Sequence, residues 1–137
     1  MKPQSAKVKG RKCRRQKPIS IASRKKKGAD LQKWTVDQIL KVHPSLEPDD
    51  VTSRSMGANG EDILLSPQAR RLFPFSIECK SRASWAFYKD LDQATINTPK
   101  DVEPILVAKA NHRKPVVIVD AEYFFNHVQP RKTRSRK

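Results

Sequence analysis

The chain is short of cysteine, glycine, aromatic side chains and long apolar runs. It has two cysteines, Cys13 and Cys79, and four glycines among 137 residues, and aromatic residues make up 7%. Two cysteines can build neither a disulfide framework nor a four-ligand zinc site, so we expect a reducing, cytoplasmic location. No apolar stretch approaches the ~20 residues of a membrane helix, and no apolar block follows the basic N-terminus as it does in a secretory signal.

Acidic residues are missing from both ends of the chain. Residues 1–27 contain twelve Lys and Arg and residues 131–137 contain five, without a single Asp or Glu. The segment 28–130 holds all 14 acids and a net charge of −2, although the whole chain carries +15. Because the ends also have few large apolar groups to offset the entropy of ordering, we predict flexible, disordered basic arms at 1–27 and 131–137 around one folded domain, 28–130.

Basic arms of this kind are typical of proteins that bind polyanions. Neutralising phosphates releases condensed counterions, which gives a salt-sensitive affinity that does not depend on sequence. The segregated charge favours nucleic acid as the partner, although basic tails can also serve solubility alone. The arms do not distinguish a ribosomal or packaging protein from an enzyme.

Apolar periodicity in the segment 28–130 predicts alternating helices and strands. Helices are expected at 29–42, 84–96 and 121–128, strands at 61–65, 73–80, 104–109 and 115–120, a loop or edge hairpin at 51–60 and a hairpin turn at 110–114. This order predicts an α/β fold, in which a small mixed β-sheet is packed against helices. The core is expected to contain the aromatic side chains Trp34, Trp85, Phe87 and Phe124.

Two acids and a lysine stand at strand positions where they can converge. Asp62 opens one predicted strand, and the next strand carries Glu78 and Lys80. Residues two apart on a strand share a face, and Asp62 lies beside Glu78 if the two strands pair through the turn at 66–74. Converging carboxylates suit Mg²⁺, or Mn²⁺, and a nearby ammonium can polarise a water or stabilise charge on a phosphate. A Glu-x-Lys pair alone is usually a solvated surface face.

The segment 56–82, MGANGEDILLSPQARRLFPFSIECKSR, resembles the core of the PD-(D/E)XK nuclease superfamily. Within that superfamily the chain is most similar to small phage endonucleases related to Holliday-junction resolvases, from about residue 27 to residue 128. The resemblance implies a restriction-endonuclease-like fold, a mixed β-sheet flanked by helices. It also implies Mg²⁺-dependent hydrolysis of phosphodiester bonds in branched DNA, and a homodimer, since two coordinated cuts in a junction call for two sites.

The same resemblance assigns roles to individual residues. Asp62 and Glu78 hold the metal, the main-chain carbonyl of Cys79 adds a ligand, and Lys80 assists the attacking water. The family commonly has a Glu on the first helix, whereas this chain has Gln32, an amide that adds no charge and is a poorer ligand for Mg²⁺. Some members of the superfamily carry Gln at this place, so Gln32 stays a candidate site residue. A missing carboxylate has three possible sources, namely Glu61, Asp30 and Asp37, although Glu61 is expected to be a surface acid facing away from Asp62.

Further polar residues are candidates for contacts with DNA. They lie before the acidic strand, in the turn between the two strands, on the second long helix and at the end of a strand: Ser53, Arg54, Ser55, Arg70, Arg71, Gln93 and Lys109. Each of them can equally be an ordinary surface residue.

Two other functions remain open from the sequence. One is a nuclease of the same chemistry that acts on linear duplex DNA. The other is a non-catalytic, basic nucleic-acid-binding protein. Against the second stands the pair of acids near 61–62 and 78, because acids repel phosphate unless a cation lies between them.

Overall fold

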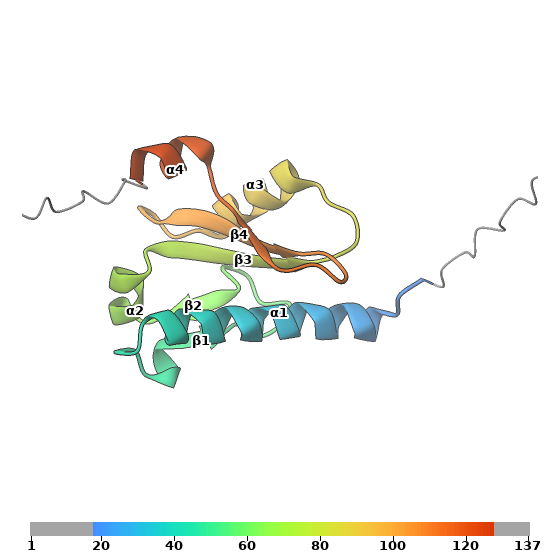
Figure 1. Ribbon diagram of the computed structural model, residues 1–137, viewed down its shortest axis with the longest axis horizontal. Coiled ribbons are helices and arrows are strands. Elements are labelled where there is room, and N and C mark those ends of the chain that lie inside the picture. The colour runs from blue at the N-terminus through green and yellow to red at the C-terminus, as the bar shows by residue number, and fades with distance from the viewer. Residues whose placement is uncertain (1–17, 128–137) are drawn as a thin grey trace, which may run out of the picture.

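The computed structural model describes residues 18–127, and its longest element is helix α1, Ile21–Val42 (Figure 1). Ser20 begins the helix as an N-cap, because its side chain accepts a hydrogen bond from the backbone N–H of Ser23 at 3.2 Å. The helix ends where the backbone N–H of His43 donates to the carbonyl of Ile39, just before Pro44. Its buried side chains lie on one face: Leu31, Gln32, Thr35 and Ile39.

The predicted boundary between the basic N-terminal arm and the folded domain is wrong. Residues 21–27 form the first turns of α1, and Gly28 lies inside the helix rather than before it. These turns have no apolar face because they project beyond the sheet, as Figure 1 shows at the blue end of α1. Helix capping and an ion pair between Lys26 and Asp30 at 3.0 Å support them instead. Residues 1–17 of the predicted arm and the tail 131–137 lie outside the described residues.

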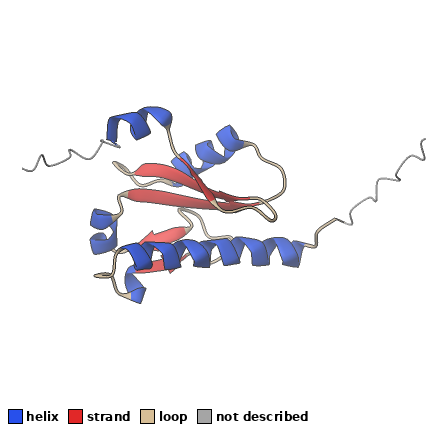
Figure 2. Ribbon diagram, in the orientation of Figure 1, coloured by secondary structure: helices blue, strands red, loops and turns tan. Residues whose placement is uncertain are grey.

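The strands form two small sheets (Figure 2). β1 (Val51–Ser53) and β2 (Ile63–Leu65) pair antiparallel, while β3 (Phe75–Ser81), β4 (Glu103–Lys109) and β5 (Val116–Ile118) form a mixed sheet in that order. β3 and β4 are parallel, β4 and β5 antiparallel, so the predicted hairpin at 110–114 is confirmed. The predicted α/β class is likewise confirmed.

Shorter helices complete the described chain. They are the 3-10 helix η1 (Pro48–Asp50), α2 (Pro67–Leu72), α3 (Phe87–Asn97) and α4 (Ala121–His127). The predicted turn at 66–74 contains α2, which starts at the N-cap Ser66 with Pro67 in its first turn. The predicted pairing of the strands before and after this turn is therefore wrong. Within residues 18–127 we find no helix both long and apolar enough to cross a lipid bilayer.

The three-stranded sheet lies between helices. α1 packs against β3 on one face and α3 packs against β4 on the other, and Figure 1 shows these layers from the side. β4, which is buried on both faces, has a continuous apolar run from Ile105 to Ala108, whereas β3 alternates, with Glu78 and Lys80 on one face. The buried core is aliphatic and includes Leu31, Val51, Ile63, Ile77, Ile105 and Val107.

The aromatic side chains predicted for the core lie mostly at the surface. Trp34 is 42% exposed, Phe87 and Phe124 are each 45% exposed, and Trp85 is half-buried. The short strands leave a thin interior that Ile, Val and Leu fill from both sides. Phe87 stands at the start of α3, and Trp34 lines an open cavity between α1 and the sheet that no further layer fills.

Candidate active site

Asp62 reaches β3 although β2 and β3 form no ladder. Its backbone N–H donates to the carbonyl of Ile77 at 2.9 Å, and its Oδ2 accepts from the backbone N–H of Cys79 at 2.7 Å. The carboxylate thus takes the place at the edge of β3 that a neighbouring strand would otherwise occupy. The predicted approach of Asp62 to the second strand is present, but one backbone and one side-chain hydrogen bond of Asp62 make it instead of a hairpin.

The loop before Asp62 is held by internal contacts. The backbone N–H of Arg54 donates to the carbonyl of Asp62 at 2.8 Å, and its Nε donates to the carbonyl of Glu61, also at 2.8 Å. Gly60 has a φ of 105°, which favours glycine, and a Cβ there would lie 3.1 Å from the Arg54 guanidinium. These contacts fix the direction in which the chain enters β2, and with it the position of Asp62.

Glu61 is a buried structural acid rather than the predicted surface acid. It is 8% exposed, and its Oε1 forms an ion pair with Arg70 at 2.5 Å. Arg70 also donates to the carbonyl of Phe75 at 2.6 Å. Arg70 therefore joins the loop, α2 and the start of β3, and both of its described partners are internal.

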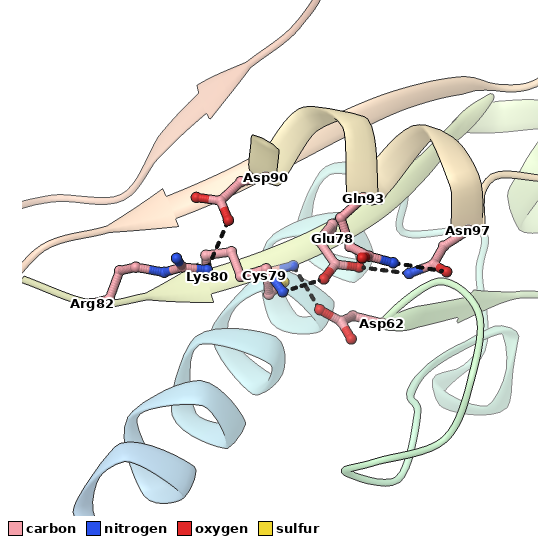
Figure 3. Close-up of polar contacts among 8 residues, drawn as sticks. All are labelled: Asp62, Glu78, Cys79, Lys80, Arg82, Asp90, Gln93 and Asn97. Carbon is pink, nitrogen blue, oxygen red and sulfur yellow. Dashed lines mark hydrogen bonds and ion pairs between the residues drawn. The ribbon is translucent and has the colours of Figure 1, made fainter. Parts of the chain in front are cut away.

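Glu78 and Lys80 lie side by side on the face of β3 that meets α3, as the strand period predicts (Figure 3). Glu78 is 5% exposed, and Lys80 Nζ lies 2.5 Å from its Oε1. Asn97, at the end of α3, donates to Oε2 at 3.4 Å. The Glu78 carboxylate is thus buried beside an ammonium that reaches the solvent-facing side.

The electrostatic surroundings of Asp62 disfavour its charge. Burial raises the pKa of Asp62 above its ordinary value of 3.8, and the charge of Glu78 raises it further. The hydrogen bond from Cys79, the charge of Lys80 and a weaker hydrogen bond from the Gln32 side chain lower the pKa in part. The two carboxylates repel each other in this partly desolvated position, and a bound cation would reduce that repulsion.

Cys79 contributes its backbone rather than its thiol. Burial raises the pKa of the Cys79 thiol to about 12, and its Sγ lies 3.7 Å from the Thr35 hydroxyl beneath α1. The N–H and C=O of one strand residue point to the same edge of a sheet, so the Cys79 carbonyl is directed to the edge where Asp62 lies. Gln32 is buried on α1, and its side-chain amide lowers the pKa of Asp62 slightly. The oxygens available to a cation are therefore two carboxylates, with a carbonyl and an amide close by.

The structure offers no third carboxylate here. Within residues 18–127 no group of three or more His, Cys, Asp or Glu side chains is placed to share a metal ion. Asp30 pairs with Lys26 on the exposed side of α1, Asp37 is exposed, and Glu61 is bound to Arg70.

The predicted DNA-contacting residues are dispersed. Ser53, Ser55 and Arg71 are exposed, whereas Arg54 and Arg70 are half-buried in the internal contacts described above. Gln93 is exposed on α3 and donates to Asn97 Oδ1 at 3.5 Å, so it reaches Glu78 only through Asn97 (Figure 3). Lys109 ends β4 opposite Ser81 and lines a cavity of about 490 Å³ with Lys27 and Trp34.

A basic groove opens beside Lys80. We use this name for a cavity of about 580 Å³ whose walls include Arg24, Lys27, Lys80 and Arg82. Arg24 and Lys27 come from the first turns of α1, Lys80 from the end of β3 and Arg82 from the residue that follows β3. Lys27 is held by Asn111, whose Oδ1 accepts from its Nζ at 2.8 Å. The groove therefore continues from Lys80 toward the part of α1 that carries the most positive charge.

Three contributors were missed from the sequence. Asn97 touches Glu78, and its only sequence signal is that it follows Gln93 by one helical turn. Arg82 forms an ion pair with the buried Asp90 at 2.8 Å, which ties the end of β3 to α3 (Figure 3). The sequence signal for Arg82 was its i, i+2 spacing from Lys80, which places it on the same face in an extended chain.

The site thus combines two carboxylates, one ammonium and a basic groove at the ends of β2 and β3. Only geometry and chemistry bear on what it does. Comparison of the chain with protein-family models, with curated proteins and with solved structures finds no match.

Proposed function

We propose that the protein is a divalent-metal-dependent DNA endonuclease that hydrolyses phosphodiester bonds, with branched DNA as its preferred substrate. The observation that carries the proposal is the approach of Asp62 and Glu78 with Lys80 on the Glu78 carboxylate, beside a basic groove. The resemblance to the PD-(D/E)XK superfamily, with its restriction-endonuclease-like fold, points to the same residues. The proposed setting is the cytoplasm, that of the host cell if the gene belongs to a phage.

The oxygens at the site fit Mg²⁺ or Mn²⁺. Mg²⁺ is usually held by one or two carboxylates and keeps several waters or substrate phosphates as its other ligands. Asp62 and Glu78 supply this number, and the Cys79 carbonyl lies on the same edge of β3. When bound, such an ion lowers the pKa of a coordinated water and neutralises charge on the phosphate.

The protein's own residues have distinct parts in the proposed reaction. Asp62 and Glu78 place negative charge in a partly buried position, where charges interact more strongly than in water, and this favours the binding of a dication. Lys80 neutralises Glu78, and its ammonium can donate a hydrogen bond to a phosphate oxygen or to an attacking water. Arg24, Lys27 and Arg82 line the path along which a strand of DNA approaches.

The acids also argue against a protein that only binds nucleic acid. A surface built to hold a polyanion gains from basic groups and loses from carboxylates, because these repel phosphate. Here Lys80, which lines the basic groove, lies 2.5 Å from the Glu78 carboxylate, so an acid stands next to a residue of the groove. A cation between acid and phosphate removes the conflict.

Two coordinated cuts in a branched substrate call for two sites, so we also propose a homodimer with two-fold symmetry. Sedimentation of the free protein and of its complex with a four-way junction measures this directly. A single protomer on the junction would refute the dimer without affecting the chemistry at Asp62 and Glu78.

The direct test is nicking of a four-way junction, a linear duplex and a single strand, with Mg²⁺ and with EDTA. The wild type should cut the junction fastest and lose cutting in EDTA, whereas Asp62→Ala should be inactive. Asp37→Ala, which removes an exposed acid from α1, is the matched control and should cut normally. Equal cutting by Asp62→Ala would refute the site. Faster cutting of the linear duplex would replace the branched substrate, and binding without cutting in Mg²⁺ or Mn²⁺ would leave a non-catalytic binder.

A further inference from the structure

Two stacked aromatic rings stand at the surface between β3 and α3. The rings of Trp85 and Phe87 lie nearly parallel, with centroids 5.3 Å apart and an interplanar angle of 11°. Phe87 is 45% exposed and Trp85 is half-buried, so neither ring belongs to the aliphatic core. We call this pair the aromatic ledge.

The ledge is held in place by the end of β3. The guanidinium carbon of Arg82 lies 5.9 Å from the centroid of the Trp85 ring, and Arg82 is fixed by its ion pair with Asp90. Asp90 is 4% exposed on the first turn of α3. Because Arg82 also lines the basic groove, the ledge lies at the end of the path that starts at Lys80.

A cavity of about 590 Å³ opens over the ledge. Its lining includes Trp85 and Phe87, the small side chains of Ala108 and Ala110, and Arg113 and Lys114 from the β4–β5 turn. This volume lies within the roughly 300–1,000 Å³ of small-molecule sites. The cavity lining thus combines aromatic rings, of which Phe87 is the more exposed, with positive charge.

We propose that the aromatic ledge receives an unpaired nucleobase of the DNA strand that enters the basic groove. The place of this base next to the cut rests on the proposed function, but the stacking itself needs no metal. A base in a duplex is stacked between its neighbours and has no free face, whereas an unpaired base can stack on an aromatic ring. The ledge would therefore select DNA that has unpaired nucleotides beside the cut, such as a junction, a flap or a bubble.

The charge around the ledge favours a nucleotide over a second copy of the chain. Among the described residues that line this cavity none is acidic, and Arg113 and Lys114 stand where a backbone phosphate would lie. A protein surface stacked here would have to face these cations and Arg82 as well. A nucleotide supplies both the flat ring and the negative charge.

The first experiment uses tryptophan fluorescence without metal. The chain has two tryptophans, so Trp34→Phe leaves Trp85 as the single reporter. Titration of this variant with oligodeoxythymidylate in EDTA should quench the Trp85 emission. An oligonucleotide of the same length with abasic sites should bind through its backbone but quench far less.

The second experiment measures affinity with a labelled oligodeoxythymidylate by fluorescence anisotropy. Phe87→Ala should weaken binding by about 5- to 150-fold, the range expected when one base loses an aromatic partner. The matched control is Phe125→Ala, which removes an exposed aromatic ring from α4 and should leave binding unchanged. Thermal melting of both variants confirms that they are folded.

Equal quenching by the abasic oligonucleotide would overturn the proposal, and so would equal affinity of Phe87→Ala and Phe125→Ala for the oligonucleotide. A Trp85 emission that changes with protein concentration alone would also overturn it, because it would indicate a second copy of the chain on the ledge. Quenching that persists in a protein that never cuts DNA refutes the proposed function and supports the ledge. Normal cutting without quenching does the reverse.

Discussion

Replacing Asp62 with Asn separates its role as a metal ligand from its role in the fold. The Asn side-chain oxygen can still accept the hydrogen bond that Cys79 donates at 2.7 Å, so the contact with β3 is kept. The change removes one negative charge from a site that has two carboxylates and one ammonium. Glu78 and Lys80 then cancel, and no net negative charge is left to attract a dication.

The expected effects follow from binding linkage. A cation that binds only the folded protein stabilises it by about 1.4 kcal/mol at ten times its dissociation constant. For a folded part of this size 1 kcal/mol corresponds to about 4–8 °C. We therefore expect Mg²⁺ to raise the melting temperature of the wild type by roughly 5–10 °C and that of Asp62→Asn far less. Cutting should fall by at least about 100-fold, the scale of one strong electrostatic contributor.

The metal-free proteins provide an independent check through pH. Burial raises the pKa of Asp62 above 3.8, so in the window just above that value the folded protein keeps a proton that the unfolded chain has released. The free energy of unfolding therefore falls as the pH rises through this window. Asp62→Asn lacks this dependence and should be at least as stable as the wild type at neutral pH.

The assay is thermal unfolding of both proteins with Mg²⁺ and with EDTA, repeated across pH, beside the junction-nicking measurement. Asp37→Asn, an exposed acid on α1, corrects for unspecific binding of Mg²⁺. The same increase in melting temperature for Asp62→Asn and the wild type would refute the reasoning. A metal-free Asp62→Asn that unfolds much more easily than the wild type would show that Asp62 is a structural acid instead.

Three further predictions concern residues around the site. Arg70→Met leaves the Glu61 carboxylate, whose side chain is 9% exposed, without its partner, so the free energy of unfolding in urea should fall by about 3 kcal/mol. The control Arg71→Met, at an exposed position, should change this free energy by less than about 0.5 kcal/mol. Equal effects of the two substitutions would contradict the internal role of Arg70. Gly28→Ala should raise the free energy of unfolding by about 0.5–1 kcal/mol, because Gly28 lies inside α1. The added Cβ fits, since the nearest side-chain atom would be 3.7 Å away. A lower free energy of unfolding would mean that the helix is interrupted there. Iodoacetamide at about pH 8 should label Cys79 slowly in the folded protein and quickly in urea, since burial raises the pKa of this thiol to about 12. Mass spectrometry measures the labelling of Cys79, and fast labelling in the folded protein would contradict this prediction.

Much of the fold was accessible from the sequence because its signals are local. The alternation that predicted a strand at 73–80 and the apolar runs that predicted strands at 104–109 and 115–120 lie in β3, β4 and β5 within a few residues. The helices predicted at 84–96 and 121–128 were found for the same reason. α2 was missed because it is short and has one buried residue, Ala69, and so no apolar stripe.

The start of α1 was missed for a related physical reason. Its first turns contain four consecutive basic residues, 24–27, and no buried apolar residue, so hydrophobic periodicity cannot reveal them. Ser20, the cap, was the local signal that could have found the true start.

For the candidate site, the sequence alone determined which groups share a face: Glu78 and Lys80 do so because strand side chains alternate with a period of two. Tertiary structure decided that Asp62 meets β3 through Cys79, that Glu78 is buried beside Asn97, and that Glu61 is bound to Arg70. These contacts join segments up to 19 residues apart in the chain. Their formation depends on how helices and strands pack, and no local period of the sequence encodes that packing.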